Sequence, residues 1–189
     1  METTAWDKTQ AMTAFAQEAA AFRLPRWEQI PSLGLYMDQV VTVVEKSLTP
    51  LLGFSGEAFI TAAMVNNYVK LGMVRKPEKK KYSREHIAGL LVITVLKQSL
   101  AIRDIRQGMD TVLLGRQPAE AYDSFCDDLE RALRLVGATL LSSEKTTEID
   151  LPGDPLILMA ACSFATRLYA AKMLAVVRDN AEQENERQQ

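Results

Sequence analysis

The chain of 189 residues is 48% hydrophobic and 24% charged, with a formal net charge of −2, so it can bury one substantial hydrophobic core or two small ones. Its longest apolar run near the end, "PLILMAACSFA", has 11 residues, whereas a membrane-spanning helix needs roughly 20. Cys126 and Cys162 form no CxxC pattern, which fits reduced thiols better than a disulfide framework or a zinc site. Because no basic leader precedes an apolar stretch, we expect a soluble cytoplasmic protein with no membrane span.

Two helices are predicted before residue 53. The alanine-rich segment 10–22 is typical of a first helix, and the following "RLPRWEQIPSLG", with two prolines and a glycine, predicts an irregular connector. A second helix is predicted over residues 36–52, because apolar side chains recur there at helical spacing. These side chains are Met37, Val40, Val41, Val44 and Leu48. The stretch "GFSGEAF" after them contains two glycines and indicates a loop.

A short third helix and a basic loop follow. Thr61 is a suitable N-cap for a helix through Leu71, and Gly72 stands where a glycine commonly ends a helix. Residues 73–82 are polar and contain Pro77, so they predict a loop.

The segment after this loop is ambiguous by periodicity alone. "IAGLLVITVL" is apolar almost all round, as a buried strand or a buried helix would be. Ser83 as N-cap, Glu85 in the first turn and the continuing "KQSL" favour a central buried helix. A brief helix, "AIRDIRQGM", is predicted next and ends near Gly115.

The second half is also predicted to be helical. A seam with a period of 3.5 residues runs along Tyr122, Cys126, Leu129, Leu133, Val136 and Leu140. It is too short to establish a coiled coil and favours ordinary antiparallel packing. Asp154 and Pro155 are a good N-cap and first residue for a last helix that runs to about Arg178.

Positive charge is concentrated between Lys70 and Arg84, where seven residues are Lys or Arg and one is acidic. Such a run is usually a solvated loop. Here it directly follows a short capped helix that carries Asn66 and Asn67. Lysines beside a groove neutralise phosphates, and asparagine reads adenine through N6 and N7. The arrangement therefore favours a recognition helix followed by a phosphate-binding wing, although the asparagines could also brace the turn locally.

The segments "ITAAMVNNYVKLGMV" and "KKYSREHIAGLLVITVLKQSLAIRDIRQGM" resemble the N-terminal domain of MerR-type regulators. A closer resemblance, over about residues 23–110, is to the uncharacterised bacterial family catalogued as domain of unknown function 1836. Its hallmarks stand here as "RLPRWEQIP", "LYMDQVV", "MVNNYVKLGMV" and "KKKYSREHIAGL". That family has no assigned biochemical activity, so the resemblance implies a fold more than a function.

The MerR resemblance implies roles for individual residues. Gly72 and Met73 take the place of the "GL" turn, and Tyr68 matches the aromatic that packs under the recognition helix. Lys80 and Tyr82 match an arginine and a tyrosine of the wing. Three features depart from the pattern: Asn66 stands where MerR proteins have a phosphate-contacting arginine, the loop between the first two helices is longer, and no long dimerisation helix with effector-binding cysteines follows.

Several other residues have a structural explanation. Tyr68 is predicted to be core, Tyr82 to pack on the central helix or touch a phosphate, and Trp27, with Tyr36 and Met37, to pin the connector to the core. His86, the only histidine, has no second ligand nearby that would suggest a metal or general-base role. The acidic group Asp123, Asp127, Asp128 and Glu130 is expected to form a solvated helix face. No enzyme motif is present.

We predict an all-α protein with a MerR-like winged helix-turn-helix domain followed by a C-terminal helical region. The expected parts are an N-terminal helix (1–24), the helix-turn-helix domain (25–115), a dimerisation or effector region (116–178) and a disordered tail (179–189). The predicted function is a bacterial DNA-binding transcriptional regulator, a homodimer on duplex DNA, with no enzymatic activity, cofactor or metal and with an unknown effector. The predicted DNA-binding residues are Asn66, Asn67, Lys70, Arg75, Lys76, Lys79, Lys80, Lys81, Tyr82 and Arg84.

Two alternatives stay open. The basic patch could instead dock an acidic partner protein, or the chain could be an enzyme whose residues converge only in three dimensions. A deep polar pocket without a basic surface beside it would favour the enzyme.

Overall fold

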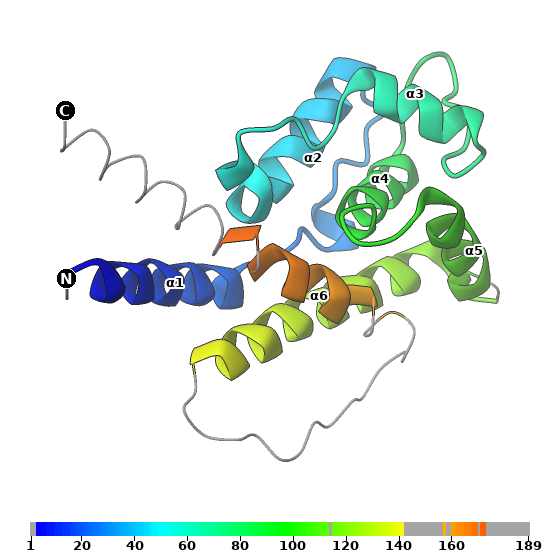
Figure 1. Cartoon of the computed structure of the whole chain (residues 1–189). Helices are drawn as coiled ribbons and strands as arrows, with labels where there is room; N and C mark the ends of the chain where they lie inside the picture. The colour runs from blue at the N-terminus through cyan, green and yellow to red at the C-terminus, as the bar shows by residue number, and fades with distance from the viewer. Residues whose placement is uncertain (1–2, 114, 142–156, 158–159, 170, 173–189) are drawn as a thin grey trace, which may run out of the picture.

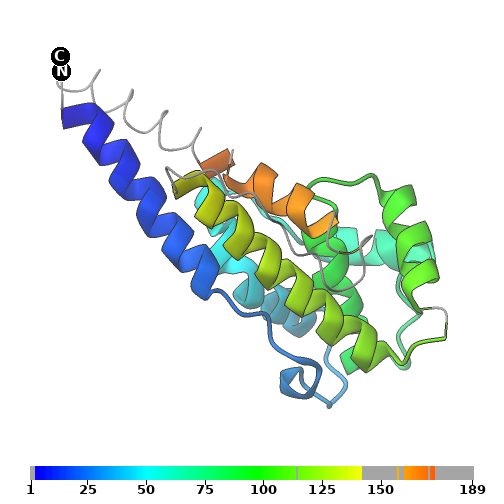
Figure 2. The ribbon, with the colours of Figure 1, turned by 90° about the horizontal axis from the view of Figure 1, so that it is seen from below.

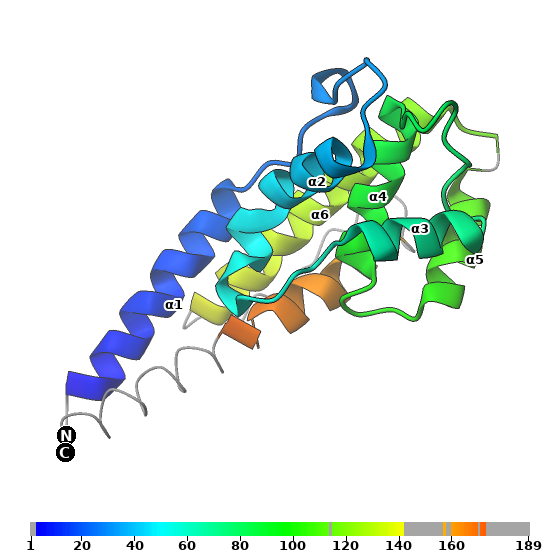
Figure 3. The ribbon, with the colours of Figure 1, turned by 90° about the horizontal axis from the view of Figure 1, so that it is seen from above.

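The computed structural model describes residues 3–113, 115–141, 157, 160–169, 171 and 172. Two long antiparallel helices, α1 (Thr3–Ala21) and α6 (Pro118–Leu141), lie side by side along one edge of the molecule (Figures 1 and 2). A further helical segment, residues 160–169, packs beside α6. α2 (Met37–Leu52) lies in the middle of the molecule and contacts both α1 and α4. α3 (Ala62–Lys70), α4 (Arg84–Leu96) and α5 (Ile102–Leu113) gather at the end away from the N-terminus of α1 (Figure 3).

The predicted all-α class is confirmed. Within the described ranges β-structure is limited to two isolated bridges, Leu35 with Tyr82 and Glu78 with Lys81. Short 3-10 turns occupy Trp27–Gln29 in the connector and Gly53–Ser55 after α2. None of the helices in the described part of the chain combines the length and apolar character that crossing a lipid bilayer requires.

Helix α4 is the central helix, as its apolar sequence predicted. Five of its apolar side chains are completely buried, at 0% exposure: Ile87, Leu90, Leu91, Ile93 and Val95. Each side chain of this kind stabilises the fold by about 1.5–3 kcal/mol when fully buried. α2 and α6 pack on α4, so the ambiguous apolar run became a helix that is covered on several sides.

The seam on α6 is used for internal packing, as predicted. Tyr122, Cys126, Leu129 and Leu133 are buried, and α1 forms the most extensive helix pair with α6. Gly137 permits a close approach to residues 160–169, because a Cβ atom there would overlap the Tyr169 hydroxyl. That hydroxyl donates a hydrogen bond to the Leu133 carbonyl at 3.2 Å.

The prediction that the acidic group on α6 forms a solvated face is wrong for two of its members. Asp128 and Glu130 are 2% and 4% exposed. Glu130 accepts the backbone N–H of Leu24 at 3.3 Å and pairs with Arg26 at 3.1 Å and Arg23 at 3.4 Å. These partners lie more than 100 positions away in the sequence, so the acid serves to anchor the connector between α1 and α2.

Asp123 completes this anchor. Its Oδ1 accepts the backbone N–H of Trp27 at 2.8 Å, and the Tyr122 hydroxyl donates to the Pro25 carbonyl at 2.8 Å. Trp27 and Met37 pack against the core, as predicted, whereas the prediction was wrong for Tyr36, which is 52% exposed.

The predicted and observed boundaries differ mainly at the ends of the chain. α1 begins at Thr3, seven positions before the expected start, whereas α3 and α4 begin directly after their predicted caps. The expected start of the last helix at Asp154, its end at Arg178 and the tail 179–189 lie outside the described residues. The division into parts stays a prediction, although one continuous core joins side chains of α1, α2, α4 and α6.

Candidate nucleic-acid interface

Helix α3 is defined at both ends by its sequence. The Thr61 hydroxyl accepts the backbone N–H of Met64 at 3.2 Å, as an N-cap should. At the other end Gly72 has φ of +71°. The N–H of Met73 bonds to the Tyr68 carbonyl at 3.0 Å and that of Gly72 to the Val69 carbonyl at 3.1 Å, which is the Schellman arrangement. α3 is therefore a short helix with fixed ends.

The two faces of α3 differ sharply. Val65 and Tyr68 are buried, at 0% and 4% exposure, so the prediction that Tyr68 belongs to the core is confirmed. The outward face consists of small or polar side chains, Ala62, Ala63, Asn66, Asn67 and Lys70, all exposed. Neither asparagine side chain hydrogen-bonds to another described residue, so the local bracing role considered for them has no support within the described ranges.

The loop between α3 and α4 contains a tight two-residue turn. The N–H of Lys81 bonds to the Glu78 carbonyl at 2.8 Å, and the two central residues, Lys79 and Lys80, have φ of +48° and +64°. Positive φ at both central positions is typical of a type I′ turn, which normally contains Asn and Gly. Residues other than glycine pay about 1–3 kcal/mol each in such sparsely populated conformations. The turn thus holds two lysines at a cost in stability.

Two backbone hydrogen bonds attach this loop to the residues before α2. The N–H of Leu35 bonds to the Tyr82 carbonyl at 2.9 Å, and the N–H of Tyr82 bonds to the Leu35 carbonyl at 2.8 Å. Gly34 allows the close approach, because a Cβ atom there would meet the Lys81 Cβ at 3.0 Å. The turn is consequently held on a short ladder with Leu35.

Most of the predicted basic side chains are exposed and lack acidic partners. Among the described residues, Lys70, Lys76, Lys79 and Lys80 have no ion pair. Lys81 lies over the Tyr36 ring at 5.7 Å. Arg75 pairs with Glu85 at 3.4 Å, but its side chain is 80% exposed. We call the five lysines and Arg75 the basic loop surface.

Two predicted contact residues face inward instead. Tyr82 is 3% exposed, its ring meets His86 edge-on at 5.5 Å, and burial raises its pKa. The Arg84 guanidinium bonds to Glu28 at 2.8 Å and to the Ile30 carbonyl at 3.0 Å, above the Trp27 ring. Both residues support the loop from behind, because folding brings residues 28–35 against them.

His86 caps the central helix. Its Nδ1 accepts the backbone N–H of Ser83 at 3.0 Å. Burial lowers its pKa, while Glu85 and the backbone of Arg75 and Lys76 act in the opposite direction. The described residues contain no cluster of three His, Cys, Asp or Glu that would suit a metal ion.

The structure adds residues that the sequence alone did not single out. Arg106 on α5 donates to the Leu71 carbonyl at 2.9 Å and so joins α5 to the C-terminal end of α3. Arg103, one helical turn earlier, has a 90% exposed side chain. The spacing of three between Arg103 and Arg106 indicated that they share a helix face. The sequence did not show that this face lies against the end of α3. Leu33 and Tyr36 are also exposed, at 78% and 52%, beside the loop.

Comparison with known proteins gives one match. The family model for the domain of unknown function DUF1836 matches residues 25–125, more than half of the chain and all of the region from the connector to the first turns of α6. No curated protein and no solved structure matches.

Proposed function

The chain belongs to the DUF1836 family, and from this premise and the geometry above we propose that it binds duplex DNA as a winged helix-turn-helix transcriptional regulator. In this proposal α2 and α3 form the helix-turn-helix, with α3 in the major groove, and residues 73–82 form the wing. The observation that carries it is that the exposed Asn66–Asn67 pair, which has no side-chain partner among the described residues, is followed by the basic loop surface at the end of the same helix and in the loop after it.

The outward face of α3 suits a groove. The exposed side chains near its start, Ala62 and Ala63, are small enough to permit close approach, and alanine contacts the thymine methyl group. One turn later the amides of Asn66 and Asn67 can each present a donor and an acceptor to N7 and N6 of adenine. N-terminal residues of a recognition helix are the ones that usually reach base edges.

The basic loop surface suits a phosphate backbone. Phosphate contacts supply affinity and position without reading sequence. The lysines of the turn are held at positive φ although Asn and Gly would be more stable there. Backbone strain retained at an exposed turn supports a functional rather than a structural reason for the lysines.

A homodimer remains part of the proposal, because paired half-sites require two-fold symmetry. The seam on α6, which lies in the predicted dimerisation or effector region, is occupied by internal packing. The dimer contact would therefore use another surface, and light scattering of the purified chain with and without duplex tests the oligomeric state.

A protein partner is the second candidate function. The exposed Leu33 and Tyr36 beside Lys81 form a mixed apolar and basic patch, which is common where proteins meet. An acidic helical peptide that binds more tightly than any duplex would favour this alternative.

The salt dependence of duplex binding tests the phosphate-binding part. We expect the wild-type chain to bind a labelled duplex with an affinity that falls steeply as salt rises. The variant Lys79→Ala/Lys80→Ala/Lys81→Ala should reduce the slope of log affinity against log salt by up to about three. Arg167→Ala, an exposed cation of the segment 160–169 outside the proposed helix-turn-helix, is the control and should leave the slope nearly unchanged. Salt-independent binding, or equal slopes for wild type and triple variant, would contradict the proposal.

A further inference from the structure

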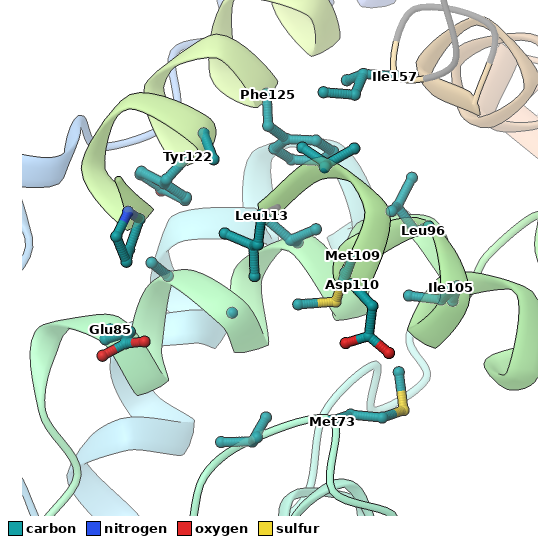
Figure 4. Close-up of a pocket in the computed structure, with 18 of the residues that line it drawn as sticks. Met73, Glu85, Leu96, Ile105, Met109, Asp110, Leu113, Tyr122, Phe125 and Ile157 are labelled. Carbon is teal, nitrogen blue, oxygen red and sulfur yellow. The ribbon is translucent and has the colours of Figure 1, made fainter. Parts of the chain in front are cut away.

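A largely apolar cavity of about 480 Å³ lies between α4, α5 and α6 (Figure 4). Its walls include Met73, Leu96, Met109, Leu113, Phe125 and Ile157. This volume falls within the range of small-molecule pockets, about 300–1,000 Å³. Asp110 and Leu113 of the lining are exposed, so the cavity is reached from solvent beside the C-terminal half of α5.

Two glycines inside helices keep this space open. Gly89 of α4 and Gly108 of α5 line the cavity, and a Cβ atom added at either would meet nothing within 4 Å. Glycine in a helix interior costs about 1 kcal/mol relative to alanine. Gly137 has a packing reason for lacking a side chain, whereas Gly89 and Gly108 have none in the described part of the chain. Their effect is to leave volume between α4 and α5 unfilled.

The apolar face of helix α5 is only partly covered by the core. Of its apolar side chains only Ile105 is fully buried, and Met109 and Val112 are half-buried while lining the cavity. The apolar face of an amphipathic helix normally packs against other side chains. Here Met109 and Val112 touch the core on one side and border the open volume on the other, and an apolar molecule would fill that volume.

The charged groups at the cavity are mainly acidic. Glu85, Asp104 and Asp110 line it together with a single arginine, Arg75. Glu85 pairs with Arg75 and Asp104 with Arg103, both at 3.4 Å. Asp110 has no ion pair among the described residues, and Figure 4 shows Asp110 and Met73 extending toward each other from opposite walls. An apolar body with one positive group therefore matches this lining best.

We propose that this cavity binds a small amphipathic organic amine, with its apolar part between α4 and α5 near Gly89 and Gly108 and its ammonium group at Asp110. The cavity is also lined by residues 72–75, which connect α3 to the basic loop, and Arg106 joins α5 to the end of α3. If α5 moves when the amine binds, the movement would be transmitted to the end of α3 and to the basic loop. This regulatory consequence rests on the proposed DNA binding, while the binding site itself does not.

Calorimetry on the full chain without DNA tests the site. The probes are naphthylmethylamine and the corresponding alcohol and carboxylate, which share one apolar body. We expect the amine to bind most tightly and the carboxylate most weakly. Asp110→Asn should reduce the preference for amine over alcohol by about fivefold or more.

Cavity-filling variants supply the structural control. Gly108→Leu and Gly89→Leu should abolish binding of all three probes while the melting temperature stays equal or rises, and Gly108→Ala should retain the amine. Absence of binding by every probe, stronger binding of the carboxylate, or unchanged binding by both leucine variants would overturn the proposal. Duplex binding is measured in parallel without the amine. Failure of the amine proposal and failure of the DNA proposal can therefore be told apart.

Discussion

The acidic group on α6 and the basic loop after α3 are both dense charge clusters in the sequence, yet folding treats them in opposite ways. Glu130 is 4% exposed and is saturated by Arg23, Arg26 and a backbone N–H. The lysines of the turn are exposed, and no acidic side chain among the described residues pairs with them. The comparison teaches that pairing and burial, rather than charge density, separate a structural cluster from a candidate binding surface.

The largest effect is expected at Glu130. Glu130→Ala leaves the buried Leu24 N–H without its acceptor and removes one carboxylate from Arg23 and Arg26, so we expect the free energy of unfolding to fall by about 1–3 kcal/mol. Urea denaturation followed by circular dichroism measures it. Asp127→Ala is the control, because Asp127 pairs with the same Arg26 at 2.9 Å but is 64% exposed; its cost should stay below about 1 kcal/mol. An equal loss of stability in Glu130→Ala and Asp127→Ala would contradict the claim that burial makes Glu130 a structural residue.

Substitutions on the outward face of α3 should change DNA recognition and leave stability nearly unchanged. Asn66→Ala/Asn67→Ala is expected to change the free energy of unfolding by less than about 0.5 kcal/mol, since neither amide has a partner in the described structure. Discrimination against the wrong base should fall by about 1–3 kcal/mol per lost bidentate contact, measured by competition between duplexes. Thr61→Ala in the same helix should instead destabilise by about 1 kcal/mol. A large loss of stability in the asparagine variant would assign Asn66 and Asn67 to the fold.

The turn offers a test in which stability and affinity change in opposite directions. Lys79→Asn/Lys80→Gly places the preferred residues of a type I′ turn at positive φ, so stability should rise by about 1 kcal/mol or more. Duplex affinity should fall, because two phosphate contacts are lost. Lys76→Gly is the matched control: Lys76 is not among the residues with positive φ, so glycine there should give no gain. A destabilised double variant would contradict the strain argument.

The smallest effect concerns His86. Burial lowers its pKa in the folded chain, so the unfolded chain binds the proton more readily. The stabilisation that His86 contributes is therefore complete above its unfolded pKa of about 6.5 and is lost as the pH falls through the folded pKa. Unfolding free energies measured across this window should fall more for wild type than for His86→Gln. Parallel pH profiles would remove this role of His86.

Features encoded within a few neighbouring residues were predictable from the sequence. The caps Thr61 and Ser83, the stop at Gly72 and the helical nature of the apolar run in α4 all follow from local chemistry. The group of exposed lysines was equally visible.

Features that depend on distant partners were not predictable. Glu130 looked like a surface residue because its partners Arg23, Leu24 and Arg26 lie more than 100 positions earlier in the sequence. Arg84 looked like a phosphate contact because Glu28, its partner, is 56 positions earlier. The cavity at Gly89 and Gly108 exists only once α4 and α5 are placed side by side.

Selection of randomised duplex DNA on the purified chain at about 150 mM salt, with Lys79→Ala/Lys80→Ala/Lys81→Ala in parallel, tests the central claim most directly. We predict that the wild type enriches a paired motif and that the triple variant loses it. No enrichment by the wild type, with the variant behaving identically, would contradict DNA recognition and bring the protein-interaction alternative forward.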